Sequence, residues 1–310
     1  MDFKNKARPY HTLNEYYRER FGKKVIKIPL NAGFSCPNRD GTISKTGCIY
    51  CSESGSGDFA GNPERSLKTQ FETMSQRMAK KWPNGYYLPY FQANTNTYGP
   101  ADYCKKLYES ALSLHPDVIG LAIATRPDCL PAEIINVLSD INKETYVSVE
   151  LGLQTIHEAT AKKINRGHTR EDFEKAVKTL REHNIEVVVH IINGLPGETP
   201  EMMKETLRFI NTQDIQGIKI HMLYIQKNTP LARLHEKMPL DLLSLETYTN
   251  IVRWQIEHMR PDIVIHRLTG DAPADELISP EWIRKKFVVM NTIDKAMRAK
   301  KTYQGVSYEP

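Results

Sequence analysis

The sequence has no apolar run of the length that a membrane span requires. Apolar runs such as residues 187–189 and 191–192 are far shorter than the about 20 residues of a transmembrane helix. The N-terminal residues MDFKNKARPYHTL also lack the apolar core of a signal peptide. We therefore expect a cytoplasmic protein that has no membrane partner.

Cysteine is scarce, and several common catalytic patterns are missing. The chain has five cysteines in 310 residues, an odd number, and the reducing cytosol expected for this protein argues against a disulfide framework. It contains no P-loop lysine motif, no His-Glu-x-x-His zinc helix and no recognisable Ser-His-Asp triad. The glycines of residues 194–198 have the wrong spacing for a dinucleotide-binding fingerprint. These absences argue against the enzyme classes that depend on such motifs.

The small excess of positive charge is concentrated at the two ends of the chain. Lysine and arginine number 42 against 37 acidic residues. Residues 1–30 contain eight basic and three acidic residues, and residues 281–302 contain seven basic and two acidic residues. Clustered basic residues bind polyanions by releasing counterions, which would suit a phosphate-rich partner. Two solvated helical faces would have the same composition, and the sequence leaves both interpretations open.

Apolar, β-branched segments alternate with amphipathic segments along most of the chain. This alternation is typical of successive βαβ units around a parallel sheet. Six or seven units predict an α/β fold with an open or partial barrel, and a full eightfold barrel is possible but would need one more strand. The expected strands are residues 25–30, 86–91, 118–124, 146–151, 186–192, 217–223 and 263–268. The expected helices include residues 63–81, 101–114, 131–141, 170–184 and 200–211.

Polar and glycine-rich segments follow the expected strands. In folds of this kind, ligands bind at the carboxyl ends of the strands. We therefore expect the binding site where these segments meet. The segments are residues 92–97, 125–128, 152–155, 193–198 and 224–227.

Three of the five cysteines lie close together, directly after the first expected strand. Cys36, Cys48 and Cys51 have the spacing C-x11-C-x2-C, and soft thiolates select zinc or iron–sulfur clusters. A structural zinc site needs four ligands, and no histidine lies inside this loop. Three cysteines suit a 4Fe-4S cluster with one open iron, although zinc and redox-sensor thiols remain alternatives. Cys104 and Cys129 are best interpreted as buried small hydrophobic residues.

The cysteine loop and three later segments resemble one known family. The Cys-Ile-Tyr-Cys sequence of residues 48–51 resembles half of the C-x3-C-x-aromatic-C pattern of the radical S-adenosylmethionine (SAM) superfamily. The longer first gap is similar to that in relatives of the elongator catalytic subunit. Four segments, which extend the resemblance over roughly residues 10–270, resemble motifs of the bacterial YhcC/YtqA-type subgroup. They are FSCPNRDGT (34–42), ELGLQT (150–155), NRGHT (165–169) and HIINGLPGET (190–199).

The resemblance implies a fold and two cofactors. It implies a partial (β/α)6-type radical SAM barrel over residues 24–270, a short basic N-terminal extension over 1–23 and a short helical basic extension over 271–310. Cys36, Cys48 and Cys51 would ligate a 4Fe-4S cluster, whose open iron would take the amino group and carboxylate of SAM. An electron donor such as flavodoxin or ferredoxin would reduce the cluster, and SAM cleavage would yield a 5′-deoxyadenosyl radical.

The resemblance also implies a set of SAM-binding residues. Tyr50 would lie near the adenine, contacting it mainly through its backbone. Gln154 and Arg166 would hold the ribose and carboxylate, since an arginine fork can bind two carboxylate oxygens. His190 and Asn193 would contact ribose and adenine. Gln92 occupies the place of the methionine amino-group site, although its segment departs from the usual Gly-Gly-Glu.

The substrate implied by the resemblance is transfer RNA. The subgroup would remodel the carbon-5 side chain of the wobble uridine, from carboxymethylaminomethyl to aminomethyl. Arg284, Lys285, Lys286 and Arg298 would then contact RNA from a C-terminal amphipathic helix. We expect Ile283, Phe287, Met290, Ile293 and Met297 to face inward on this helix. The alternatives are a radical SAM enzyme that acts on a small metabolite and a non-catalytic, zinc-stabilised RNA-binding protein.

Overall fold

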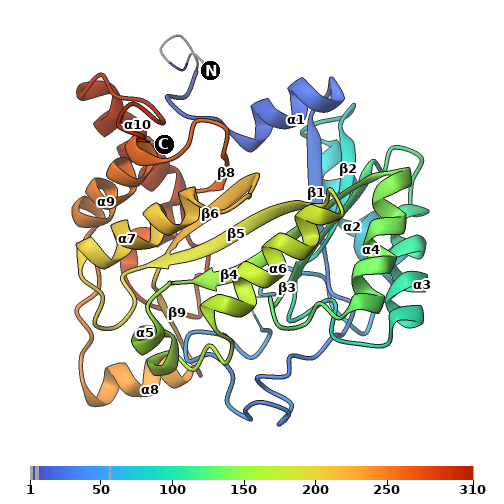
Figure 1. The fold of residues 1–310 in the computed structure, drawn as a ribbon, viewed down its shortest axis with the longest axis horizontal. Coiled ribbons are helices and arrows are strands. Elements are labelled where there is room, and N and C mark those ends of the chain that lie inside the picture. Colours follow the sequence, from blue (N-terminus) through green and yellow to red (C-terminus); the bar gives the residue numbers. More distant parts are fainter. Residues whose placement is uncertain (1–2, 4–6, 56, 310) are drawn as a thin grey trace.

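A curled parallel sheet forms the centre of the molecule (Figure 1). The computed structural model describes residues 3, 7–55 and 57–309, so that the basic residues Lys4 and Lys6 lie outside the described part. The sheet has the strand order β1-β2-β3-β4-β5-β6-β8 and is a half-barrel, which confirms the predicted partial barrel. Its strands are β1 (Val25–Leu30), β2 (Tyr86–Phe91), β3 (Gly120–Thr125), β4 (Tyr146–Gln154), β5 (Glu186–Asn193), β6 (Gly217–Met222) and β8 (Val264–Arg267).

Helices connect the strands and cover the outside of the sheet (Figure 1). Thr169 and Thr199 cap two of them, because each side chain accepts a hydrogen bond from the backbone three residues later. None of the described helices is long and apolar enough to cross a membrane. The helices are α1 (Leu13–Phe21), α2 (Leu67–Ala79), α3 (Ala101–Leu112), α4 (Ala132–Glu144), α5 (Glu158–Lys163), α6 (Arg170–Glu182), α7 (Pro200–Asn211), α8 (Pro230–Lys237), α9 (Leu245–His258) and α10 (Lys286–Ala299).

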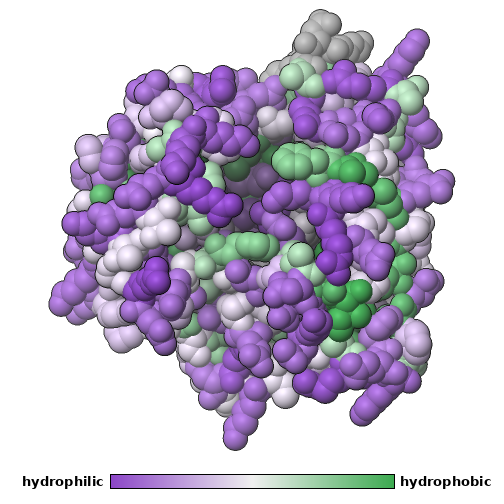
Figure 2. Space-filling view, turned by 180° about the vertical axis from the view of Figure 1, so that it is seen from behind, coloured by the Kyte–Doolittle hydropathy of each residue, from purple (hydrophilic) through white to green (hydrophobic). Residues whose placement is uncertain are grey.

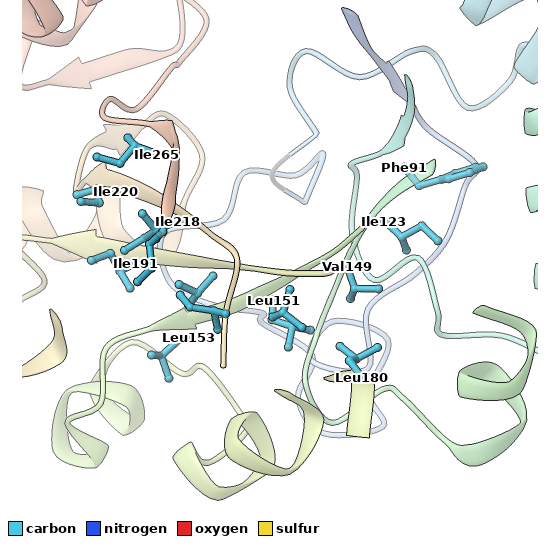
Figure 3. Close-up of a cluster of buried hydrophobic side chains, with 14 of the residues drawn as sticks. Phe91, Ile123, Val149, Leu151, Leu153, Leu180, Ile191, Ile218, Ile220 and Ile265 are labelled. Atoms are coloured by element: carbon cyan, nitrogen blue, oxygen red, sulfur yellow. The ribbon is translucent and has the colours of Figure 1, made fainter. Parts of the chain in front are cut away.

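The main hydrophobic core lies between the sheet and these helices. Figure 3 shows aliphatic side chains of neighbouring strands, such as Ile123, Val149 and Ile191, in a continuous row with Leu180 of α6. All four are at most 1% exposed. Side chains alternate between the two faces of a strand. The strand residues that alternate with these core residues therefore point into the barrel.

The inner face of the sheet changes character along the strands. At the amino ends, Leu88 and Tyr146 pack with Tyr17 of α1 in a second apolar cluster that closes this end of the barrel. Tyr90 and Glu150 lie further along the same strands, and polar residues follow at the carboxyl ends. The opposite side of the molecule from Figure 1 is hollowed near its centre (Figure 2). The barrel interior is therefore apolar at one end and polar at the other.

A smaller element and the C-terminal helix complete the fold. β7 (Ile225–Gln226) pairs antiparallel with β9 (Leu277–Ser279), and α10 packs against α9. The segments near both ends of the chain also meet, because the backbone N–H of Gln304 donates to the carbonyl of Pro9 at 2.9 Å. The expected boundaries at residues 23 and 270 remain a prediction.

The predicted inward face of the C-terminal helix needs one correction. Ile283, Ile293 and Met297 are buried as expected, but Phe287 is 69% exposed. The reason is that residues Glu281–Lys285 form a 3-10 turn, so that the α-helical phase begins only at Lys286. Val289, which is fully buried, occupies the inward position instead.

Candidate active site

A cavity of about 230 Å³ opens among the cysteine loop and the carboxyl ends of the strands. It lies at the edge of the sheet that the sequence predicts as the binding site. Most of the predicted cluster-binding and SAM-binding residues line it, whereas Asn193 does not. The predicted residues that line the cavity are Cys36, Cys48, Tyr50, Cys51, Gln92, Gln154, Arg166 and His190.

Two of the sequence motifs meet to hold the cysteine loop in place. The Asn38 side chain donates to the carbonyl of Asn165 at 2.7 Å and lies 3.5 Å from Cys48 Sγ. The Asn165 side chain donates in turn to the carbonyl of Gly47 at 2.7 Å. Gly167 must be glycine, because its φ is +77° and a Cβ would lie 2.7 Å from Asn38 Oδ1. These contacts bind the loop to the segment between α5 and α6.

The three clustered thiols are suited to an iron–sulfur cluster. Cys36, Cys48 and Cys51 are half-buried along one cavity, whereas Cys104 and Cys129 are buried. A hydrogen bond from Cys51 lowers the pKa of the Cys48 thiol to about 6, which favours the thiolate. Among the described residues, no three His, Cys, Asp or Glu side chains are placed around a single metal ion. The soft donor set and shared cavity fit the cluster.

The guanidinium of Arg166 makes four hydrogen bonds to protein atoms. Its Nη1 donates to the carbonyls of Leu153 at 2.7 Å and Thr155 at 2.6 Å. Its Nε donates to the carbonyl of His168 at 2.9 Å, and its Nη2 donates to Glu158 at 3.1 Å. The side chain is only 1% exposed. As arranged here, Arg166 holds the turn that follows β4, and a direct bond to SAM remains a prediction.

That turn presents Gln154 to the cavity. Gln154 has a φ of +66°, a left-handed conformation that a β-bulge between Gly152 and Gln154 accompanies. A Cβ on Gly152 would lie 2.6 Å from Gln154 Nε2, so that glycine leaves room for this side chain. Tyr50 lines the same cavity, and burial raises the pKa of its hydroxyl well above the usual value. Both remain predicted SAM contacts.

Asn193 lies away from the other predicted residues. It is 1% exposed, and its side-chain amide exchanges two hydrogen bonds of 2.9 and 3.0 Å with Gln255 of α9. This amide pair fastens the end of β5 to the helix behind it. A contact between Asn193 and SAM therefore has no support from its placement and remains only a prediction.

A layer of ionisable residues crosses the barrel beneath the predicted SAM site. Its centre is Glu150, whose side chain is fully buried. Glu150 Oε1 accepts from Lys27 at 2.6 Å, and Oε2 accepts from Lys219, from the Tyr90 hydroxyl at 2.6 Å and from His190 at 2.8 Å. We call this the charged layer. It comprises Lys27, Tyr90, Glu150, His190, Lys219, His221, His266 and Arg267.

Burial and mutual repulsion shift the ionisation of the charged layer. Burial, opposed by attraction to Glu150 and reinforced by Lys27 and Arg267, lowers the pKa of Lys219 to about 7. Burial and Lys219 lower the pKa of His190 to about 4, so that this imidazole is neutral at pH 7. Burial alone would raise the pKa of Glu150, but the two lysines hold it well below the usual value.

Sequence reasoning missed most of this layer, although a signal was present. Lys27, Glu150 and Lys219 interrupt strands that are otherwise apolar, in the segments VIKIPL, YVSVELGLQ and GIKIHM. A charged residue in a buried strand needs a partner of opposite charge. Three such interruptions therefore indicate that the strands face a common polar interior.

Of the four basic residues predicted to bind RNA, two donate to backbone carbonyls, one forms an ion pair and one is exposed. Arg284 donates to the carbonyls of Ala274 at 2.6 Å and Leu277 at 3.2 Å, and Arg298 donates to the carbonyl of Ala7. Lys286 forms an ion pair of 3.0 Å with Asp271, which lines the cavity. Lys285 is exposed beside it. The start of α10 therefore lies near the cavity wall.

Comparisons with known proteins agree with this site. The radical SAM superfamily matches residues 36–210, and the Radical_SAM C-terminal domain matches residues 215–299. Protein YtqA of Bacillus subtilis (strain 168) is 47% identical over 307 residues, 99% of this chain and 95% of that protein. Protein YhcC of Escherichia coli (strain K12) is 35% identical, over 89% of this chain and 88% of that protein.

More distant matches include tRNA-modifying proteins. The solved Elp3 of Methanocaldococcus infernus, which lacks N-terminal residues 1–46, has a TM-score of 0.67 at 18% identity. The match covers 90% of this chain and 64% of that chain, and it shows a shared fold. A tRNA uridine(34) acetyltransferase of the same organism is 29% identical over 52% of this chain and 30% of that protein. The chain belongs to the radical SAM superfamily and is an enzyme whose cofactors are a 4Fe-4S cluster and SAM.

Proposed function

We propose that this radical SAM enzyme modifies transfer RNA at the carbon-5 side chain of the wobble uridine, from carboxymethylaminomethyl to aminomethyl. The observation that carries the proposal is the partial match to a tRNA uridine(34) acetyltransferase, a protein named for the same nucleoside position. The fold that the chain shares with Elp3 is consistent with it. The proposed change within the uridine side chain derives from the motif resemblance described above.

The proposed roles of the site residues follow from their places in the cavity. Cys36, Cys48 and Cys51 hold the cluster, and Tyr50 and Gln154 contact SAM. When bound, these cofactors supply a carbon radical that abstracts hydrogen from an unactivated C–H bond. The chain's own residues orient the substrate and exclude water from the cavity.

The start of α10 is the proposed contact surface for RNA beside the cavity. Lys286 is paired with Asp271 of the cavity wall, and Lys285 is exposed next to it. A phosphate that displaced the aspartate from Lys286 would place the backbone of an RNA loop at the cavity mouth. Arg284 and Arg298 donate to backbone carbonyls, so that they support this surface and offer fewer free donors to phosphate.

The direct test is turnover of defined RNA. We expect the anaerobically reconstituted enzyme, given SAM and a reductant, to convert 5-carboxymethylaminomethyluridine to 5-aminomethyluridine in transfer RNA, as measured by nucleoside mass spectrometry. The Cys36→Ala variant is the inactive control. If the enzyme cleaves SAM but leaves this nucleoside unchanged, the RNA proposal is wrong and a small-metabolite substrate gains support.

A binding experiment tests the contact surface at α10. The double variant Lys285→Glu/Lys286→Glu should lower transfer RNA affinity without changing SAM binding. Loss of two phosphate contacts should also flatten the slope of log affinity against log salt by about 1.4–1.8. The matched control is Lys105→Glu/Lys106→Glu, an exposed adjacent pair on α3. Equal weakening by the two double variants would show only general attraction to positive charge.

A further inference from the structure

The charged layer contains more positive than negative charge. Its cationic side chains are Lys27, Arg267 and, when protonated, Lys219. Its one carboxylate is Glu150. Its histidines add no charge at pH 7, because burial lowers the pKa of each of them well below that pH. Within the described part of the chain, this layer therefore lacks the negative charge that would balance it.

Glu150 pairs with both Lys27 and Lys219, so that Arg267 is the cation of the layer that has no carboxylate partner among the described residues. Both oxygens of Glu150 are occupied, one by Lys27 and the other by three donors. Lys219 donates to Glu150 and, at 3.2 Å, to the Tyr90 hydroxyl, which leaves one of its three N–H groups for a ligand. Lys219 also lines the cavity.

Arg267 completes a pair of donors on the cavity wall. It ends β8, is exposed and lines the cavity, and the described part of the chain offers its guanidinium no hydrogen bond or ion pair. The two aspartates on the cavity wall are held elsewhere. Asp58 accepts from Ser52 at 2.7 Å and from Gln226 at 3.1 Å, and Asp271 is paired with Lys286.

Burying positive charge without a negative partner costs free energy, and an anion that binds in the cavity would offset part of that cost. We propose that Lys219 and Arg267 together bind an anionic group of the substrate, a carboxylate or a phosphate, in the cavity. The arginine fork matches two oxygens of such a group, and the lysine supplies a point charge. The inference deepens the proposed function and rests on it for the identity of the RNA.

The depth of Lys219 separates it from Gln154, one of the predicted SAM contacts, whereas His190, another of them, belongs to the charged layer. Glu150, to which Lys219 is bonded, lies four residues before the end of β4, whereas Gln154 is the last residue of that strand. A substrate whose anionic group reached Lys219 would therefore extend past Gln154 into the barrel. Under the proposed function, the group is the carboxylate of the carboxymethylaminomethyl side chain, which the product lacks.

The experiment compares two RNA stem-loops that differ in this carboxylate. The cluster-loaded enzyme with SAM is titrated under anaerobic conditions with labelled RNA that carries carboxymethylaminomethyluridine or aminomethyluridine. We expect the wild type to prefer the first RNA by about 10- to 100-fold, as for hydrogen bonds to a charged group. Arg267→Gln and Lys219→Met should abolish the preference, and Arg267→Lys should restore part of it. Arg233→Gln, at an exposed arginine of α8 outside the cavity, is the matched control.

Two results would overturn the inference directly. One is a preference that survives both Arg267→Gln and Lys219→Met. The other is a loss of SAM affinity in these variants with the RNA preference intact, which would assign the pair to the carboxylate of SAM. Because Arg267 is exposed, its replacement leaves the buried network of Glu150 in place and keeps the test valid if Lys219→Met does not fold.

A second measurement separates this inference from the proposed function. Lys219 labelling by trinitrobenzenesulfonate is followed by mass spectrometry in the full chain, with acetate or inorganic phosphate as the anion probe. We expect either anion to protect Lys219 in the wild type but not in Arg267→Gln. If protection is seen while the wild type binds both RNAs equally, the anion site stands and the proposed RNA substrate is wrong. Absence of protection by both anions overturns the anion site itself.

Discussion

Replacing Arg166 with lysine tests whether its guanidinium holds the turn after β4. The arginine donates to three backbone carbonyls, those of Leu153, Thr155 and His168. A lysine retains the charge but, as a point donor, replaces about one of these bonds in the same place. Two buried carbonyls are then left without their donor, at about 1–3 kcal/mol each. We therefore expect the Arg166→Lys variant to lose about 2–6 kcal/mol of unfolding free energy.

Urea unfolding of the cluster-loaded enzyme without SAM measures this loss, and a SAM titration of the same samples measures binding. SAM affinity should fall together with stability, because the displaced turn carries Gln154. The matched control is Arg170→Lys, at an exposed arginine 3.8 Å from Glu174, which should change stability by less than about 0.5 kcal/mol. An unchanged urea midpoint with lost SAM binding would refute the structural role and assign the fork directly to the SAM carboxylate.

Three further predictions concern the cluster, the C-terminal helix and pH. Cys36→Ala should abolish reconstituted 4Fe-4S absorbance, whereas Cys104→Ala, at a fully buried site, should retain it; equal iron loss would contradict the ligand assignment. Ile293→Ala should cost about 2–5 kcal/mol in urea unfolding, because it empties a buried position, and Phe287→Ser should cost almost nothing. Because the pKa of Lys219 is lowered to about 7, the RNA carboxylate preference should be full below that pH and should weaken as pH rises through it. A preference that is constant from pH 6 to 8 would contradict this ionisation.

The sequence alone was sufficient to predict the sheet and the cysteine loop. The strands could be predicted because buried parallel strands are continuous apolar segments separated by amphipathic helices. Both β1 and β2 have the predicted bounds. The cysteine loop could be recognised because three of the five cysteines lie within one short segment.

Tertiary structure decided how distant residues share the interior. Lys27 and Glu150 lie 123 residues apart, and Lys219 lies 69 residues beyond Glu150, yet the parallel register brings all three into one layer. No local pattern encodes that pairing, because it arises only when the sheet curls. The guanidinium of Arg166 is likewise engaged by carbonyls that only the folded turn presents. Local periodicity thus determined the elements, whereas the curvature of the sheet determined which of their charged groups must neutralise one another.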